Sequence, residues 1–490
     1  MQLRILLLLA LALSSTQSLA ANNEVHPGVS QQLLNISDIE DASGALDAST
    51  ILKNKEAYQW TDISGEIANF GYTKSPYWFR FSIVNQLATD ADKLLEISYP
   101  QLDFIDLYQI ENGEVTSMQK TGDNLPFSNR AIDHPYFLFP THVPANSTVE
   151  YLARIQTEGT MQVPISLWDK QEFLVTIGQE DQIHAVFYGI LTVLALFNFF
   201  VYLALREKTY LYYSMATFGY MFFFATMRGK PFQVLFPDFP AIHNQSLLII
   251  IPFTTMFSAL FASSFLSLKN YSKVLDKSTK AIAILAFGSI VASFFIDYAY
   301  SVRLSVLLAI PSYLILFAIG PIVWAKGAHL ARYYTAAWGL LTAGTAMTAL
   351  NKAGAIPSNF ISEYGMQIGS AMEAILLTVA LAERLYRERE DKLAAQESTI
   401  KEHKERLQTE IKLMNQALHH PITRLPNRAC FEMLINDSVR RRKDGRFAVC
   451  LINLTRFHEI NKTLGHNNAD LLIEQAARLI NSTAQKLPGI

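Results

Sequence analysis

Residues 184–205 read HAVFYGILTVLALFNFFVYLAL, an apolar stretch without Asp, Glu, Lys or Arg. An α-helix needs roughly 20 apolar residues to cross a hydrocarbon core about 30 Å thick, so this stretch predicts a transmembrane helix. Six further apolar runs follow between short polar loops, at 210–227, 247–266, 281–296, 304–324, 333–350 and 364–385. Because no soluble domain needs so many apolar runs in succession, residues 183–385 predict a bundle of seven transmembrane helices.

The basic residues of the loops orient this bundle. If the N-terminus lies outside, the segments on the cytoplasmic side carry Arg206, Lys208, Lys269, Lys273, Lys277, Lys280, Lys326, Arg332, Arg384, Arg387 and Arg389. The opposite loops carry Arg228, Lys230, Arg303 and Lys352. Lys and Arg accumulate on the cytoplasmic side of membrane proteins, so we expect a cytoplasmic C-terminus and a soluble domain on each side of the membrane.

The first 20 residues have the pattern of a secretory signal peptide. Arg4 provides the positive charge, residues 5–13 the apolar core, and Ser18-Leu19-Ala20 a small-x-small cleavage site. An uncleaved eighth anchor is the alternative, although the apolar core is short for a span. Export agrees with the orientation that the loop charges predict, so residues 21–180 are expected outside the cytoplasm.

Residues 21–180 predict an extracytoplasmic all-β sandwich or jelly roll. Short alternating or aromatic runs occur at 77–84, 93–99, 104–110, 136–139, 149–156 and 163–168. Turn residues separate these runs, and Asn112-Gly113 between two of them predicts a tight hairpin. Several strands at this spacing are typical of a sandwich or jelly roll. The domain has no cysteine, so its hydrophobic core has to stabilise it without disulfides.

Three motifs in this domain resemble a known family: SPYWFRF at 75–81, YPQLDFIDLY at 99–108 and PISLW at 164–168. They are similar to the second type of extracellular domain of the bacterial seven-transmembrane receptors with diverse intracellular signalling modules (7TMR-DISM). In that family, as here, a seven-helix block follows the domain directly. The resemblance implies a multi-pass receptor of the bacterial inner membrane with a periplasmic sensor domain related to carbohydrate-binding modules. Its ligand would be a small molecule or a carbohydrate.

Aromatic side chains on an exposed sheet face can stack on sugar rings. The candidates in this domain are Tyr58, Trp60, Tyr72, Tyr77, Trp78 and Trp168, and the leading pair, Tyr77 and Trp78, lies in the first motif. Packing in the core or between neighbouring strands is the alternative for each of them. The histidines of the domain are scattered, so we expect no metal site there.

Glu373 is an ionisable residue well inside the last apolar run, which makes it a candidate functional residue. It could act as a relay carboxylate, as an intramembrane switch that pairs with His184 or Arg228, or simply as a hydrogen-bonding group of the bundle. A transporter or channel with accessory soluble domains is therefore a second hypothesis for the whole chain. Small residues at 342–346 predict a close contact between helices.

Residues 386–418 predict a coiled-coil signalling helix. Apolar or aromatic residues recur at every seventh position: Tyr386, Leu393, Ile400, Leu407 and Met414. The second heptad position is partly polar, with Glu390, Glu397 and Lys404, so the seam is weak and a solvated single helix is the alternative. A helix that leaves the last span without a break can carry a shift of that span inward, and the seam predicts a homodimer.

Residues 419–490 resemble the N-terminal portion of a diguanylate-cyclase-type (GGDEF) domain. The resemblance is carried by ITRLPNR at 422–428, an apolar run at 447–454 that predicts a buried strand, NKTLGH at 461–466 and DLL at 470–472. It implies a partial α/β domain and a role in cyclic di-GMP signalling. In the family, Asn461 and Asp470 would recognise the guanine, whereas helix capping is the alternative for both.

The tail departs from the family at the position that binds metal. The family places Asp at the positions of Asn453 and Thr455, and the first Asp holds the Mg²⁺ that bridges the nucleotide phosphates. A neutral amide does not provide the anionic ligand that Mg²⁺ prefers. The Gly-Gly-Asp-Glu-Phe hairpin of the family is also not present up to Ile490. We therefore expect no catalytic residues, and Mg²⁺ and GTP as cofactors only of a complete, active domain.

The sequence is compatible with two hypotheses for the function of the cytoplasmic end. The chain is a receptor with a catalytically incomplete cyclase-type module, or it is the regulatory half of a longer enzyme that also carries a phosphodiesterase (EAL) domain. The formal net charge of −2 gives no basic surface for nucleic acid, so the expected partners are membrane lipid, the extracytoplasmic ligand and a second copy of the chain.

Overall fold

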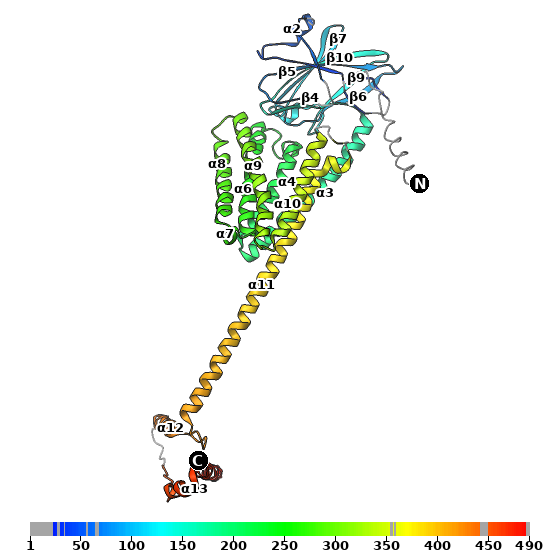
Figure 1. Cartoon of the computed structure of the whole chain (residues 1–490). Helices are drawn as coiled ribbons and strands as arrows, with labels where there is room; N and C mark the ends of the chain where they lie inside the picture. The colour runs from blue at the N-terminus through cyan, green and yellow to red at the C-terminus, as the bar shows by residue number, and fades with distance from the viewer. Residues whose placement is uncertain are drawn as a thin grey trace, which may run out of the picture. The chain divides into compact units, whose positions relative to one another are not determined.

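The computed structural model describes residues 23–26, 30–33, 35–54, 57–63, 68–352, 356, 359–441 and 449–486 (Figure 1). The signal peptide predicted at 1–20 lies outside these residues. The chain divides into two compact units, Met1–Arg384 and Leu385–Ile490. The first unit contains antiparallel sheets and long helices, and the described part of the second contains helices joined by irregular segments.

Two antiparallel sheets form the first part of the first unit. One has six strands in the order β3-β2-β5-β10-β7-β8, the other has four in the order β1-β12-β6-β9, and β4 and β11 make a two-stranded ribbon. Their bounds are β1 Gln31–Gln32, β2 Ile36–Glu40, β3 Thr61–Asp62, β4 Ala68–Tyr72, β5 Tyr77–Asn85, β6 Ala91–Ile97, β7 Phe104–Glu111, β8 Glu114–Thr121, β9 Phe137–Val143, β10 Ser147–Gln156, β11 Thr160–Val163 and β12 Ile165–Asp169. Alternate residues of β5, such as Phe79, Phe81 and Ile83, join one core with residues of the four-stranded sheet. The predicted β-sandwich is confirmed.

Turn chemistry decides the strand ends. Asn112 and Gly113 link β7 to β8 with φ of 54° and 82°, the left-handed backbone that a two-residue hairpin needs, so the predicted hairpin is confirmed. The single run predicted at 163–168 is instead divided between β11 and β12 at Pro164. Proline has no N–H for a sheet ladder, so it separates the two strands.

Seven long helices carry the seven apolar runs, one run on each. They are α3 Lys170–Leu205, α4 Lys208–Met227, α6 Pro240–Phe265, α8 Lys273–Ala292, α9 Tyr298–Ala325, α10 Ala331–Lys352 and α11 Phe360–Leu418, with the short α5 Lys230–Val234 and α7 Leu268–Tyr271 between them. Within the described residues, α3, α6, α9 and α11 are long and apolar enough by themselves to cross a membrane. The count of seven spans stays a prediction.

Helices α10 and α11 touch through glycines. A Cβ on Gly344 would lie 2.1 Å from the carbonyl oxygen of Gly365, and one on Gly369 would lie 2.7 Å from the carbonyl oxygen of Leu340. The backbones are therefore closer than any side chain allows, which confirms the close helix contact predicted from the small residues at 342–346.

The second unit continues α11 to Leu418 and adds two helices, α12 Arg428–Arg441 and α13 Phe457–Ala484. The buried strand predicted at 447–454 is wrong for the part that is described. Residues 449–454 form no strand there, and Leu451 is 95% exposed. A strand needs a neighbouring strand for its backbone groups, and the described residues of this unit provide none beyond the isolated His419–Pro426 bridge.

Candidate functional site

Polar and charged side chains cluster at the junction between the sandwich and the helices of the first unit. Strand β12 passes into α3 without a loop, because Asp169 ends the strand and caps the helix by accepting from the N–H of Gln171 at 3.0 Å. Phe173 in the first turn of α3 packs on Trp168, with ring centroids 5.7 Å apart and nearly perpendicular. The end of this sheet and the start of α3 are therefore packed together without an intervening loop.

Gln101, in the second sequence motif, binds the end of another helix. Its amide Nε2 donates to the carbonyl oxygens of Thr226 at 3.1 Å and Met227 at 3.0 Å, in the last turn of α4. Carbonyl groups in the last turn of a helix lack the full set of helical partners, and a side chain of the sandwich binds two of them here, in addition to the N–H of Gly229 that Thr226 accepts at 2.9 Å. The sandwich thus contacts α4 through a buried, directional pair of hydrogen bonds.

Buried acidic groups lie beside this contact. Asp103 accepts from the backbone N–H of Glu158 at 2.8 Å, and Asp123 Oδ2 lies 3.8 Å from Nε2 of His243 at the start of α6. Burial and the neighbouring Asp103 raise the pKa of Asp123 well above its usual value, and burial raises the pKa of Asp103 as well. Folding therefore favours a proton on this carboxyl pair.

Arg130 is the cation of the junction, and aromatic rings surround it. Its guanidinium lies 4.5 Å from the ring centroid of Phe127, 4.3 Å from that of Phe137 and 5.9 Å from that of Phe232, which belongs to α5. It also donates to the carbonyl oxygen of His134 at 3.1 Å. Burial lowers the pKa of Arg130 to about 10, so the side chain stays charged at neutral pH. Sheet and helical segments thus meet on one buried cation.

Ion pairs surround the buried centre on the helical side. Arg228 pairs with Glu180 of α3 at 3.1 Å, and Lys230 pairs with Asp181 at 3.4 Å. Between the two cations, Gly229 has φ 73°, and a Cβ there would lie 3.1 Å from Cβ of Pro100 in the sandwich. Glycine therefore lets the chain turn directly against the sheet domain.

Glu96 gives the sandwich a pH-dependent stability. It is 5% exposed, accepts from Nε1 of Trp168 at 2.6 Å, and burial raises its pKa to about 7 from 4.5. Between these pH values the folded state binds more protons at Glu96 than the unfolded state does, so the contribution of Glu96 to stability is fully present at low pH and is lost as the pH rises through about 7.

We expect Glu96→Gln to make this decline shallower. Glutamine keeps an acceptor for Trp168 but cannot ionise, so above pH 7 the variant gains on the order of 3 kcal/mol over the native protein, at about 1.4 kcal/mol per pKa unit. Thermal unfolding between pH 4.5 and 8 measures it. Parallel curves for the two proteins would contradict the assignment.

A second polar cluster holds α11 where it leaves the other helices. Arg384 pairs with Glu207, before the start of α4, at 2.8 Å and donates to the carbonyl oxygen of Ser264 in α6 at 3.1 Å. Tyr210 of α4 donates to the carbonyl oxygen of Leu381 at 3.2 Å. The end of the last span is therefore tied to two neighbouring helices.

Glu373 is buried on α11, but its predicted partners are elsewhere. Arg228 pairs with Glu180 and Asp181, and the ring of His184 lies 5.8 Å from that of Tyr364. Tyr364 and Glu373 are nine residues apart, or about 13 Å along a helix. In this structure Glu373 pairs with neither His184 nor Arg228, because helical rise separates these groups along the bundle, and its role as an intramembrane switch stays a prediction.

The two aromatic ligand candidates have different surroundings. Trp78 is fully buried: the short helix α2 Ala48–Lys53 covers it, and its ring stacks on that of Tyr108 at 5.8 Å. Its proposed role as an exposed stacking surface is therefore wrong, because α2 closes the outer face of the six-stranded sheet. Tyr77 is half-buried against Phe70, with ring centroids 4.2 Å apart.

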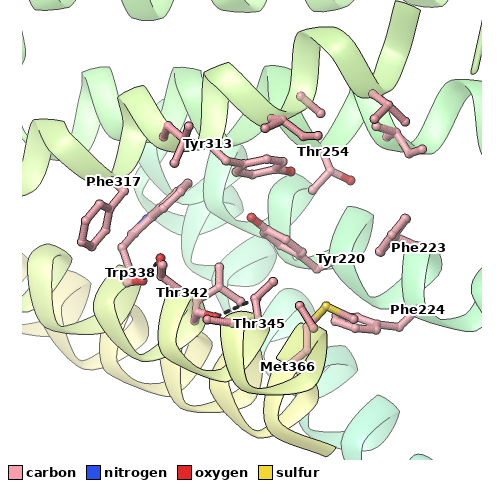
Figure 2. Close-up of a pocket in the computed structure, with 18 residues that line it drawn as sticks. Tyr220, Phe223, Phe224, Thr254, Tyr313, Phe317, Trp338, Thr342, Thr345 and Met366 are labelled. Carbon is pink, nitrogen blue, oxygen red and sulfur yellow. Dashed lines mark hydrogen bonds between the residues drawn. The ribbon is translucent and has the colours of Figure 1, made fainter. Parts of the chain in front are cut away.

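A cavity of about 520 Å³ lies among α4, α6, α9, α10 and α11 (Figure 2). Figure 2 shows Tyr220, Tyr313 and Trp338 turned toward one space. The sequence did not predict this cavity, because residues of five helices that are separate in the chain form it.

In the second unit, the motif ITRLPNR joins two helices. Asn427 donates through Nδ2 to the carbonyl oxygen of Ala417 at 2.6 Å, near the end of α11, and accepts from the N–H of Cys430 at 3.0 Å in α12. Arg424 has φ 55°, a conformation that favours glycine, and glycine is the residue that the GGDEF family has there.

The tail residues at the family's metal and guanine positions are Asn453, Asn461 and Asp470. Asn453 is exposed outside any helix or strand, and no group of three or more His, Cys, Asp or Glu that could hold a metal occurs in the described part of the chain. The amide of Asn453 does not provide the anionic ligand that Mg²⁺ prefers. Asn461 and Asp470 both lie half-buried on α13, on either side of a break at Gly465, and Oδ1 of Asn461 is buried without a hydrogen-bond partner among the described residues.

The architecture is that of a multidomain membrane protein with a β-rich domain joined to a helical bundle. Residues 35–169 match the family model "7TMR-DISM extracellular 2", residues 180–384 match "7TM diverse intracellular signalling", and residues 417–488 match "Diguanylate cyclase, GGDEF domain". The chain thus has the domain order of a 7TMR-DISM receptor followed by a GGDEF region, as the sequence motifs predicted.

Part of the chain is similar to a known bacterial protein. The chain is 33% identical over 75 residues to the bifunctional diguanylate cyclase/cyclic di-GMP phosphodiesterase MucR of Pseudomonas aeruginosa. The match covers 15% of this chain and 11% of that protein.

Proposed function

We propose that this protein is a seven-span receptor that transmits an extracytoplasmic signal, of a small molecule or carbohydrate, to a cytoplasmic module of cyclic di-GMP signalling. The observation that supports it is one continuous helix: α11 is tied to the bundle at Arg384 and extends to Leu418. At the opposite end, the sandwich holds α3 and α4 directly through Asp169 and Gln101. Ligand binding that moves the sandwich thereby biases the position of α11.

In this proposal, α11 pairs with the α11 helix of a second copy of the chain. The heptad residues Leu393, Ile400 and Met414 are 51%, 68% and 58% exposed. An apolar stripe at every seventh position on a polar helix is stabilised by a matching helix, so two α11 helices pair as a coiled coil. Because half of the seam is polar, two registers of the pair differ little in free energy and the bundle can select between them.

The GGDEF region is proposed to regulate rather than to synthesise. Asn453 and Thr455 replace the family's metal-binding pattern, so no carboxylate is available there to hold Mg²⁺ against the phosphates. Asn461 and Asp470, which the family uses for guanine, are retained. The region therefore keeps the means to sense a guanine nucleotide without the means to join two of them.

Disulfide cross-linking tests the transmission. In a Cys450→Ser background, Ile400→Cys is expected to form a dimer rapidly on oxidation, whereas Ser398→Cys, about 200° away around the helix, forms it slowly. Gln101→Ala, far earlier in the chain, is expected to change the rate of dimer formation by Ile400→Cys. The matched change of the half-buried Gln109 of β7 to Ala is expected to leave that rate unchanged. An unchanged rate of disulfide formation in the Gln101→Ala variant would contradict the proposal that the sandwich transmits a signal to α11.

Incubation with nucleotide tests the catalytic part. The purified full chain, supplied with GTP and Mg²⁺, is expected to form no cyclic di-GMP by mass spectrometry, because no anionic ligand stands at Asn453. Asn453→Asp serves as the matched variant for metal binding. Cyclic di-GMP formed by the native chain would exclude a purely regulatory role.

A further inference from the structure

The cavity among the transmembrane helices has the size of a ligand site. Its volume of about 520 Å³ falls within the range of pockets that bind small molecules. Tyr220 of α4, Tyr313 of α9 and Trp338 of α10 line it together with Met366 of α11 (Figure 2). Because Met366 belongs to α11, this helix forms part of the wall of the cavity.

The lining selects a neutral, apolar ligand. Besides the aromatic rings, it consists of aliphatic side chains, Met366 and three threonines, and it includes no acidic or basic side chain. A charged group would lose its hydration here without gaining a counter-ion. A molecule with an apolar body therefore fits, and a carboxylate or an amine does not.

Two polar atoms of the lining lack a partner. The indole Nε1 of Trp338, a residue that is only 3% exposed, and the hydroxyl oxygen of Tyr220 are buried and have no hydrogen-bond partner among the described residues. The threonine hydroxyls are already used, since Thr254, Thr342 and Thr345 each donate to a carbonyl oxygen of their own helix at 2.7–2.8 Å. An indole N–H can only donate, so the missing group is a hydrogen-bond acceptor on the ligand.

The cavity also opens on the outside of the bundle. Ile310 and Leu314 of α9 line it and are 59% and 64% exposed. Side chains of this kind on a transmembrane helix face acyl chains. A lipophilic molecule can therefore reach Trp338 from the bilayer without crossing water.

We propose that this cavity binds a neutral lipophilic molecule of the bilayer whose carbonyl oxygen, as an ester or ketone, accepts the hydrogen bond of Trp338. This site is independent of the ligand of the sandwich and gives the bundle an input of its own. Because Met366 belongs to α11, an occupied cavity packs directly against the helix that leaves the membrane.

Photolabelling of the full chain tests the site. The probe is the methyl ester of a hexadecanoic acid that carries a diazirine and an alkyne, used in dodecyl maltoside, a detergent without a carbonyl group. We expect labelled peptides from α9 and α10, and much weaker labelling by the corresponding free acid at pH 8. Trp338→Phe keeps the ring but loses the N–H and is expected to weaken labelling about tenfold, the effect of one net hydrogen bond.

Two matched substitutions separate the cavity from the general lipid-facing surface. Ala346→Phe fills the cavity and is expected to abolish labelling, whereas Ala318→Phe, on an exposed part of α9 outside it, leaves labelling unchanged. Thermal unfolding of each variant shows whether it is folded, and Trp338→Phe still tests the site if Ala346→Phe is not. Equal labelling of native protein and Trp338→Phe, or labels spread evenly over exposed residues such as Phe295, would mean adventitious lipid only and overturn the proposal.

Discussion

Arg130→Ala is expected to lower the free energy of unfolding by about 3–5 kcal/mol, because desolvated cation–π contacts contribute about 2 kcal/mol or more and an unpaired buried carbonyl oxygen costs about 1–3 kcal/mol. The substitution removes a guanidinium packed against Phe127, Phe137 and Phe232, and it leaves the carbonyl oxygen of His134 without its donor. Thermal unfolding in detergent, followed by tryptophan fluorescence, measures the loss.

A matched variant isolates the effect of burial. Arg80 also lies over an aromatic ring, that of Trp60 at 4.7 Å, but on a half-buried sheet surface. Arg80→Ala is therefore expected to cost only about 0.5–1 kcal/mol. Arg130→Lys keeps the charge without the planar stacking group and should fall between the two. Equal losses for Arg80→Ala and Arg130→Ala would show that the junction is not a centre of stability.

Gly344→Ala is the second substitution with a large expected effect. The added Cβ would lie 2.1 Å from the carbonyl oxygen of Gly365, so α10 and α11 must separate. Overpacking of this kind costs about 1–3 kcal/mol or more, and backbone cannot rotate away as a side chain can. A lower unfolding temperature of the purified protein is the expected readout.

Gly339 provides the control on the same helix. A Cβ there meets nothing within 4 Å, so Gly339→Ala is expected to stabilise the helix by up to about 1 kcal/mol through helix propensity. The two substitutions are chemically identical and should have opposite signs. If Gly344→Ala were as stable as Gly339→Ala, the close contact between α10 and α11 would be refuted.

Periodicity and turn chemistry were enough to predict most elements of this protein. Each of the seven apolar runs lies on one helix, since a helix that is apolar all round is recognisable without its neighbours. The hairpin at Asn112-Gly113 follows from the φ values that these two residues tolerate. These are local properties, and the local sequence determines them.

The polar site at the junction of the sandwich and the helices was harder to predict, because segments far apart in the sequence form it. Gln101 stands in a recognised motif, but its partners Thr226 and Met227 carry no sequence signal because they lie more than 100 positions away. Phe232 belongs to a short loop helix that no periodic pattern marks. Residues that act only in contact with distant segments cannot be identified from either segment alone.

The sequence by itself determined the order of the domains, the apolar helices, the sandwich class and the substitution of the metal position by Asn453. Only the tertiary structure decided that α2 buries Trp78, that Glu373 is remote from His184 and Arg228, and that Trp338 lines an aromatic cavity. The physical reason is that burial and pairing depend on which surfaces meet. A residue's neighbours along the chain set its backbone conformation, whereas the packing of separate helices and sheets sets its environment.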